Sequence, residues 1–158
     1  MIEEVAEVAS LHKWEYHIFE KEFENEISDI ENVDNNIYGI CFSPPKSEPI
    51  ALTFDSNRRL QSILFANAEY DSAVKTKKQY TIFSKTQYAG MEAHKIVIDL
   101  LRYLSSKYFS EFKIVDESYY WETDDVNILK ANFEKYDKLM DDFAKILEDI
   151  PKEINRKK

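Results

Sequence analysis

Apolar residues recur every three or four positions over about residues 90–109, and this spacing predicts an amphipathic helix. Its apolar stripe consists of His94, Val97, Leu101, Leu104 and Tyr108. Lys95, Asp99 and Arg102 fall on the opposite side, at spacings of three and four residues that allow ion pairs along a helix. The stretch therefore predicts one long helix with a defined buried face.

A second long helix is predicted over about residues 124–150, where the apolar positions alternate in steps of four and three. They are Leu129, Phe133, Tyr136, Met140, Phe143, Leu147 and Ile150. Such a seam has to be covered by a sheet, by the other helix or by a second copy of the chain. We expect it to lie against the rest of one compact body.

Outside these helices, short runs rich in aromatic and β-branched residues predict strands. The runs lie at about 13–20, 37–43, 50–54, 59–66, 79–85 and 111–116. A short acidic helix over about 2–11 precedes them. Residues 13–30 also carry apolar positions at helical spacing, so a helix there is the alternative to the strand.

Strands that are grouped in the chain and followed by helices favour the α+β class over a doubly wound fold. We therefore predict a mostly antiparallel sheet of five or six strands, with the two long C-terminal helices packed on one of its faces. One domain over residues 1–150 fits the length of the chain, and residues 151–158 form a loose basic tail.

The composition of the chain argues against several functional classes. The chain has two glycines, too few for a Gly-rich phosphate loop or a dinucleotide fingerprint, so no cofactor is expected. One cysteine, Cys41, gives no intramolecular disulfide. The first residues lack the basic and apolar regions of a signal peptide, so none is expected, and no stretch of about 18 apolar residues occurs. A cytoplasmic protein without membrane contact is the expectation.

The formal net charge of −9 argues against nucleic acid as a partner, because binding there depends on neutralising phosphates. Residues 116–149 alone carry 11 acids and 4 bases. Acidic ends that face a basic middle within the fold would explain this distribution. The other explanation is an acidic surface that meets a basic protein partner.

His94 is the first candidate for chemistry, because it lies on the buried stripe near the start of a helix. Such a histidine can act as a general base or bind a metal. A buried histidine more often is neutral and hydrogen-bonded within the core. Catalysis also requires a positioned partner, which spacing does not reveal.

Three carboxylates, Asp116, Glu117 and Glu122, lie close in sequence to the aromatic run Tyr119, Tyr120 and Trp121. Paired carboxylates beside aromatic rings suit acid–base chemistry on a stacked substrate, and with His94 they offer mixed ligands to a metal. No diagnostic metal-ligand spacing is present, so no metal is predicted. The alternative is a solvated acidic turn whose aromatics cover the end of the core.

A resemblance rests on several short motifs. They are Phe42–Pro45, Glu48–Pro49, Lys85–Gly90, His94, Leu100–Leu104, Asp116–Glu117 and Tyr120–Thr123. Together they resemble a family of small, uncharacterised bacterial proteins, over roughly residues 37–140. The resemblance implies a bacterial origin and brings no catalytic residues. Where many such sequences have glycine after the Asp-Glu pair, this chain has Ser118 and Tyr119.

Two functions follow as hypotheses. The first is a non-enzymatic, acidic binding protein that contacts another macromolecule through its acidic and aromatic surface, and neutralisation of a basic toxin is one form of it. The alternative is a small enzyme or small-ligand binder that uses His94 with Asp116, Glu117 or Glu122. The first is favoured because the sequence lacks the motifs that the second requires.

Overall fold

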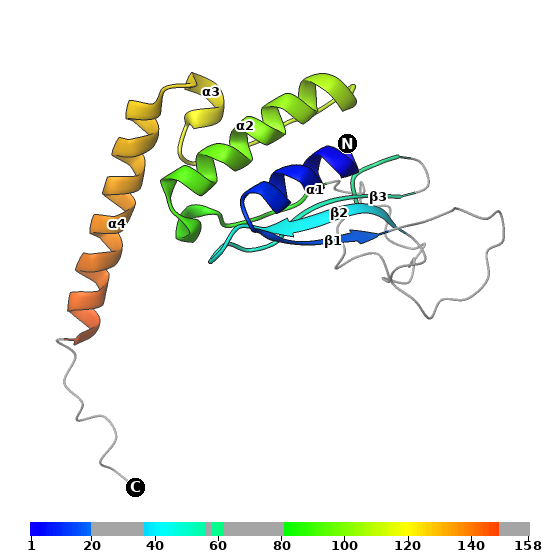
Figure 1. The fold of residues 1–158 in the computed structure, drawn as a ribbon. Helices are drawn as coiled ribbons and strands as arrows, with labels where there is room; N and C mark the ends of the chain where they lie inside the picture. Colours follow the sequence, from blue (N-terminus) through cyan, green and yellow to red (C-terminus); the bar gives the residue numbers. More distant parts are fainter. Residues whose placement is uncertain (20–36, 56–57, 62–80, 149–158) are drawn as a thin grey trace, which may run out of the picture. The chain divides into compact units, whose positions relative to one another are not determined.

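The computed structural model describes residues 1–19, 37–55, 58–61 and 81–148. The chain divides into two compact units, Met1–Ala89 and Gly90–Lys158 (Figure 1).

The first unit combines a helix with a sheet. Helix α1 spans Ile2–Leu11, and the strands are β1 (Glu15–Phe19), β2 (Tyr38–Ser43) and β3 (Ile50–Phe54). The sheet is antiparallel in the order β1-β2-β3. Helix α1 packs on β1 and β2, because its apolar stripe places Val5 and Ala9 in the core.

Strand β2 lies at the centre of the described sheet and needs a glycine. Gly39 has a φ of +139°, and a Cβ atom there would lie 2.1 Å from the backbone oxygen of Leu52. On the other side of the strand, Phe42 is buried and its ring stacks on that of Trp14, with centroids 6.0 Å apart. The prolines after β2 end the strand, and Ser47 closes the turn by donating from its backbone N–H to the Pro44 oxygen at 3.0 Å.

The described part of the second unit, residues 90–148, contains three helices. They are α2 (Met91–Tyr108), the four-residue α3 (Tyr120–Thr123) and α4 (Val126–Glu148). Its core joins one residue from each of them, Ile98, Tyr120 and Leu129. The ion pairs predicted along α2 are confirmed, since Asp99 contacts Lys95 at 2.6 Å and Arg102 at 2.9 Å.

The predicted sheet of five or six strands is wrong, because the described residues form three strands. Residues 111–116 form no strand, and Val115 is 80% exposed. Residues 81–85 likewise form no strand, although Lys85 accepts a backbone hydrogen bond from Glu48. Of 59–66, the described part makes one isolated bridge, between Leu60 and Phe54. An alternating pattern predicts an extended chain, but a strand also requires a neighbour for its hydrogen bonds.

The other elements follow the pattern closely. The strand at 13–20 is confirmed as β1, while the rest of 13–30 lies outside the described residues. The short helix predicted over about 2–11 is confirmed as α1, but its packing on the described sheet was not predicted. The predicted tail, 151–158, is also outside the described residues.

The predicted burial of the α4 seam holds only for its first part. Leu129 is fully buried and Phe133 packs partly against the core of the second unit. Further along the helix, the seam residues Met140, Phe143 and Leu147 are 41%, 54% and 52% exposed. Within the second unit, the predicted burial of the seam is therefore wrong from Met140 to Leu147, and Ile150, its last predicted residue, lies outside the described residues.

Candidate functional site

His94 and Asp116 meet in the second unit, and Ser118 lies between them. The Nε2 atom of His94 is 3.2 Å from Oδ1 of Asp116 and 2.9 Å from Oγ of Ser118. The Ser118 hydroxyl donates to Oδ2 of Asp116 at 2.7 Å. All three residues are buried. Because the one hydroxyl proton of Ser118 goes to the carboxylate, Nε2 of His94 must carry the proton that points at this pair.

The Asp116 carboxylate is fully occupied by donors. In addition to His94 and the Ser118 hydroxyl, it accepts hydrogen bonds from the backbone N–H groups of Ser118 and Trp121, both at 2.9 Å. Burial acts to raise the pKa of Asp116, but the hydrogen bonds from His94, Trp121 and Ser118 outweigh it and hold this pKa well below its usual range. The carboxyl group is therefore ionised and satisfied.

The local sequence explains how this turn forms. The Asp116 side chain accepts from the backbone two residues on, the Asx-turn geometry typical of Asp and Asn. Ser118 continues the turn by accepting from the backbone N–H of Tyr120 at 3.2 Å, and Tyr119 takes a left-handed φ of 60°. The turn is tied to α4 by Asn132, which donates to the Ser118 backbone oxygen at 2.9 Å. The network holds α3 and the start of α4 in place.

The same three residue types form nucleophilic triads in hydrolases, but in a different arrangement. A triad histidine uses one ring nitrogen for the serine and the other for the carboxylate. Here a single nitrogen of His94 contacts both groups, and the Ser118 hydroxyl donates its hydrogen bond to Asp116. This arrangement does not activate the hydroxyl and instead stabilises the turn.

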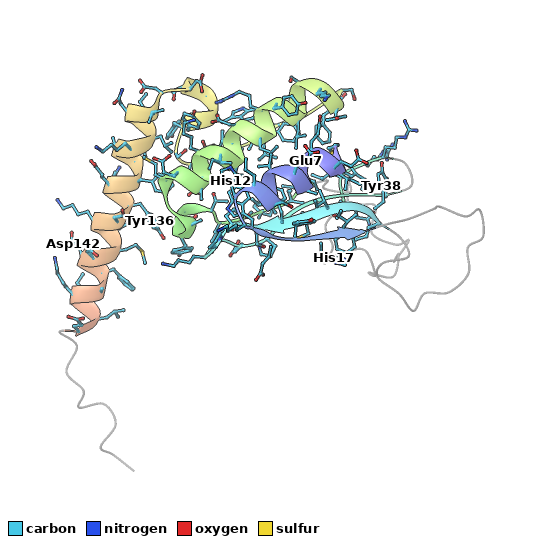
Figure 2. All side chains as sticks on the ribbon, in the orientation of Figure 1. Glu7, His12, His17, Tyr38, Tyr136 and Asp142 are labelled. Carbon is cyan, nitrogen blue, oxygen red and sulfur yellow. The ribbon has the colours of Figure 1, made fainter. Side chains whose placement is uncertain are left out.

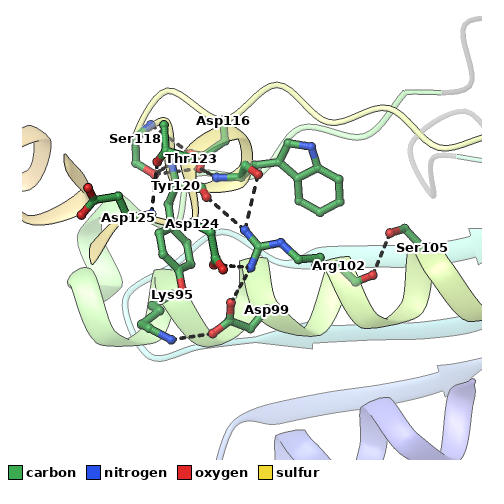
Figure 3. Close-up of polar contacts among 11 residues, drawn as sticks. Lys95, Asp99, Arg102, Ser105, Asp116, Ser118, Tyr120, Thr123, Asp124 and Asp125 are labelled. Carbon is green, nitrogen blue, oxygen red and sulfur yellow. Dashed lines mark hydrogen bonds and ion pairs between the residues drawn. The ribbon is translucent and has the colours of Figure 1, made fainter. Parts of the chain in front are cut away.

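Arg102 holds the opposite end of α3 (Figure 3). Its Nη2 atom donates to the backbone oxygens of Tyr120 at 3.0 Å and Trp121 at 3.4 Å. Its Nη1 atom donates to Asp99 and Asp124, both at 2.9 Å. On the same side of α2, the hydrogen bond to Asp99 raises the pKa of Lys95. Arg102 thus gives the Tyr120 oxygen a second donor beside the backbone N–H of Asp124 at 2.9 Å, and it also donates to the Trp121 oxygen.

The remaining predicted site residues separate in the structure. Glu117 and Glu122 are exposed and make no described contact with His94, so the structure brings together only one of the three carboxylates with the histidine. Tyr119 is 59% exposed, Tyr120 is buried and Trp121 is half-buried. The aromatic run is thus divided between surface and core, and Tyr119 is its exposed member.

Sequence reasoning missed Ser118 and the role of Arg102. A signal for Ser118 was available, because Asp-x-Ser is the spacing of an Asx turn. Arg102 was placed correctly on the polar side of its helix, but nothing in the spacing showed that it would reach α3. No group of three or more His, Cys, Asp or Glu residues suited to a metal occurs in the part of the chain that the structure describes.

A second candidate site is the last three turns of α4, whose side chains are drawn in Figure 2. Large apolar residues line one side of the helix over this stretch. We call this the apolar face of α4, and it consists of Tyr136, Leu139, Met140, Phe143, Ile146 and Leu147. All except the half-buried Tyr136 are exposed, with fractions between 41% and 65%. Concentrated apolar surface of this kind typically marks an interaction site.

None of the described helices is long and apolar enough to cross a membrane. Comparisons of the chain with protein-family models, with curated proteins and with solved structures give no match. The resemblance to small bacterial proteins therefore stays a prediction.

Proposed function

We propose that the protein is a non-enzymatic binding protein that recognises another protein through the apolar face of α4. The observation that carries the proposal is the exposure of this face, in which Leu139 is 65% and Phe143 54% exposed. The same helix buries Leu129 completely. One end of α4 is therefore anchored in the fold while the other presents apolar side chains.

The charge of the chain indicates the chemistry of the partner. A net charge of −9 attracts a basic protein at long range and repels acidic ones, and such steering acts on association rate and specificity more than on affinity. A basic protein is thus the partner that we propose, and neutralisation of a basic toxin is one form that this function takes.

The enzyme alternative has one observation in its favour, the 3.2 Å contact between His94 and Asp116. We prefer the binding function because this carboxylate already accepts three hydrogen bonds from its own turn and a fourth from His94. A general base needs a lone pair that faces a substrate. The α4 residues, in contrast, are open to a partner.

Site-specific photo-crosslinking tests the binding function. Phe143→p-benzoylphenylalanine places the crosslinker on the apolar face, and the same substitution at Lys138 places it on the opposite side of α4 as a matched control. In the cells that express the protein, we expect an adduct with a second, basic protein from position 143 and none from position 138. Adducts at neither position, or adducts with this chain alone, would contradict the function.

A further inference from the structure

We infer that, when no partner is bound, the apolar face of α4 is covered by the same face of a second copy, with the two helices antiparallel. The inference is tied to the proposed function because both use the apolar face of α4. The second copy and the partner compete for this face. A second copy of the chain is always present in a solution of the protein. Self-pairing would thus keep this surface from contacting other proteins.

A helix is the element that fits this face. Its residues are spaced by three and four positions, which is the spacing that a second helix matches when it packs alongside. A strand is a poor fit, because the backbone hydrogen-bonding groups within α4 are used inside the helix and offer no edge for a ladder. The face from Tyr136 to Leu147 is about 16 Å long at the rise of a helix.

The sequence of the face favours the antiparallel direction. When two copies of α4 run in opposite directions, Met140 lies opposite Phe143 of the second copy and Tyr136 lies opposite Leu147 of the second copy. Each aromatic ring then meets a flexible aliphatic chain, which fills space well. In the parallel direction, each tyrosine would face tyrosine and each phenylalanine would face phenylalanine, which crowds the same layer with two rings.

Residues at the two edges of the face are compatible with this pairing. Leu139 and Ile146 of the two copies lie opposite each other on one side, which widens the apolar contact. On the other side Asp137 lies opposite Ala144 of the second copy, so that this pair brings no like charges together. Lys138 and Lys145 point to the opposite side of the helix, at the positions a helix leaves in solvent.

The apolar area that the two copies can bury sets the expected affinity of the dimer. Side chains of this size that are about half exposed offer roughly 100 Å² each, or roughly 500 Å² per copy. Two copies then bury about 1,000 Å², at the lower end of specific interfaces. Each copy carries a net charge of −9, so two copies repel each other at long range and the dimer should strengthen when salt screens this repulsion. We therefore expect a reversible dimer with a dissociation constant in roughly the micromolar range, which a tighter partner displaces.

Sedimentation equilibrium of the full chain tests the dimer. We expect a concentration-dependent monomer–dimer equilibrium for the natural sequence. Phe143→Glu should weaken it by about 30-fold or more, as for a central interface residue. Lys138→Glu is the matched control with the same new charge on the opposite face, and it should change the dissociation constant less than about threefold. A natural chain that stays monomeric at high micromolar concentration overturns the inference.

Disulfide trapping tests the direction, in a Cys41→Ser background that removes the natural thiol. An equimolar mixture of Tyr136→Cys and Leu147→Cys chains should form the mixed disulfide. Tyr136→Cys alone should not, because its two thiols would be about 16 Å apart along the helix axis. Efficient trapping of Tyr136→Cys with itself would instead establish the parallel direction and overturn the antiparallel one.

The failures of the two proposals are distinguishable. A monomeric chain that still crosslinks to a basic protein from position 143 leaves the proposed function in place and removes the dimer. A dimer whose position 143 crosslinks only to a second copy, inside the expressing cells as well as in solution, removes the proposed function and leaves the dimer.

Discussion

The guanidinium of Arg102 lies 5.2 Å from the ring of Tyr120 and donates to the backbone oxygen of the same residue at 3.0 Å. Tyr120 is buried, so a single arginine stabilises both the side chain and the carbonyl group of a core residue. Lysine has the charge of arginine but lacks the planar, forked set of donors that makes these contacts together.

Arg102→Lys should therefore destabilise the protein, by about 1–2 kcal/mol in the free energy of unfolding, because the donors to Tyr120 and Trp121 are lost. The ion pairs of Arg102 contribute less, since its side chain is about one-third exposed. Urea unfolding measures the effect. Lys130→Ala, which removes only an exposed pair with Glu134, is the control and should stay within about 0.5 kcal/mol. Equal effects of the two substitutions would contradict the role of Arg102.

Asp116→Asn should cost about 2 kcal/mol or more near neutral pH, because an amide nitrogen cannot accept the hydrogen bonds that the carboxylate receives. Glu117→Gln removes the charge of the exposed neighbouring residue and should have little effect. Denaturant unfolding at pH 7 compares the two variants.

The same substitution predicts a pH dependence. The pKa of Asp116 is lowered in the folded protein, so its contribution is fully present above the value of about 3.9 for an unfolded aspartate. It is lost as the pH falls from there toward the folded pKa. The stability difference between the natural chain and Asp116→Asn should thus shrink between pH 5 and pH 3, to be measured by unfolding at each pH. A difference that stays constant over this interval would show that the carboxylate is not stabilised by its donors.

Gly39→Ala should lower the free energy of unfolding by about 3 kcal/mol or more, because the added Cβ atom clashes with the Leu52 oxygen at a position where φ is already strained. Gly90→Ala is the matched control. Gly90 also has a positive φ, of +89°, but a Cβ atom there meets nothing within 4 Å. In thermal unfolding, the melting temperature of Gly39→Ala should lie well below that of Gly90→Ala. The reverse order would contradict the close approach of β2 to β3.

The sequence predicted the parts of the fold that local periodicity determines. The two long helices were predicted within a few residues, because each repeats its apolar stripe over several turns. The strands were overestimated because alternation along 111–116 reports only an extended chain. Ile114 there contacts the helical core while Val115 points to solvent, and no neighbouring strand is needed for either.

The candidate site was only half predictable. His94 and Asp116 were chosen for their residue types, and their contact depends on how the chain folds back after α2. Ser118 and Arg102 were missed because their roles are hydrogen bonds to one short turn, which leave no periodic signal. On α4, the periodicity correctly located the apolar residues from Leu129 to Leu147. The prediction that all of them are buried was wrong, because periodicity does not show what covers an apolar face.

The division of α4 into an anchored and an open part is tested most directly by the free energies of unfolding of Leu129→Ala and Phe143→Ala. Both are measured well below the concentration at which any dimer forms, so that only the fold of a single chain is reported. We predict that Leu129→Ala loses about 2–5 kcal/mol and that Phe143→Ala changes stability by less than about 0.5 kcal/mol. If Phe143→Ala destabilises the single chain as strongly as Leu129→Ala, the apolar face belongs to the protein's own core and is not available to a partner.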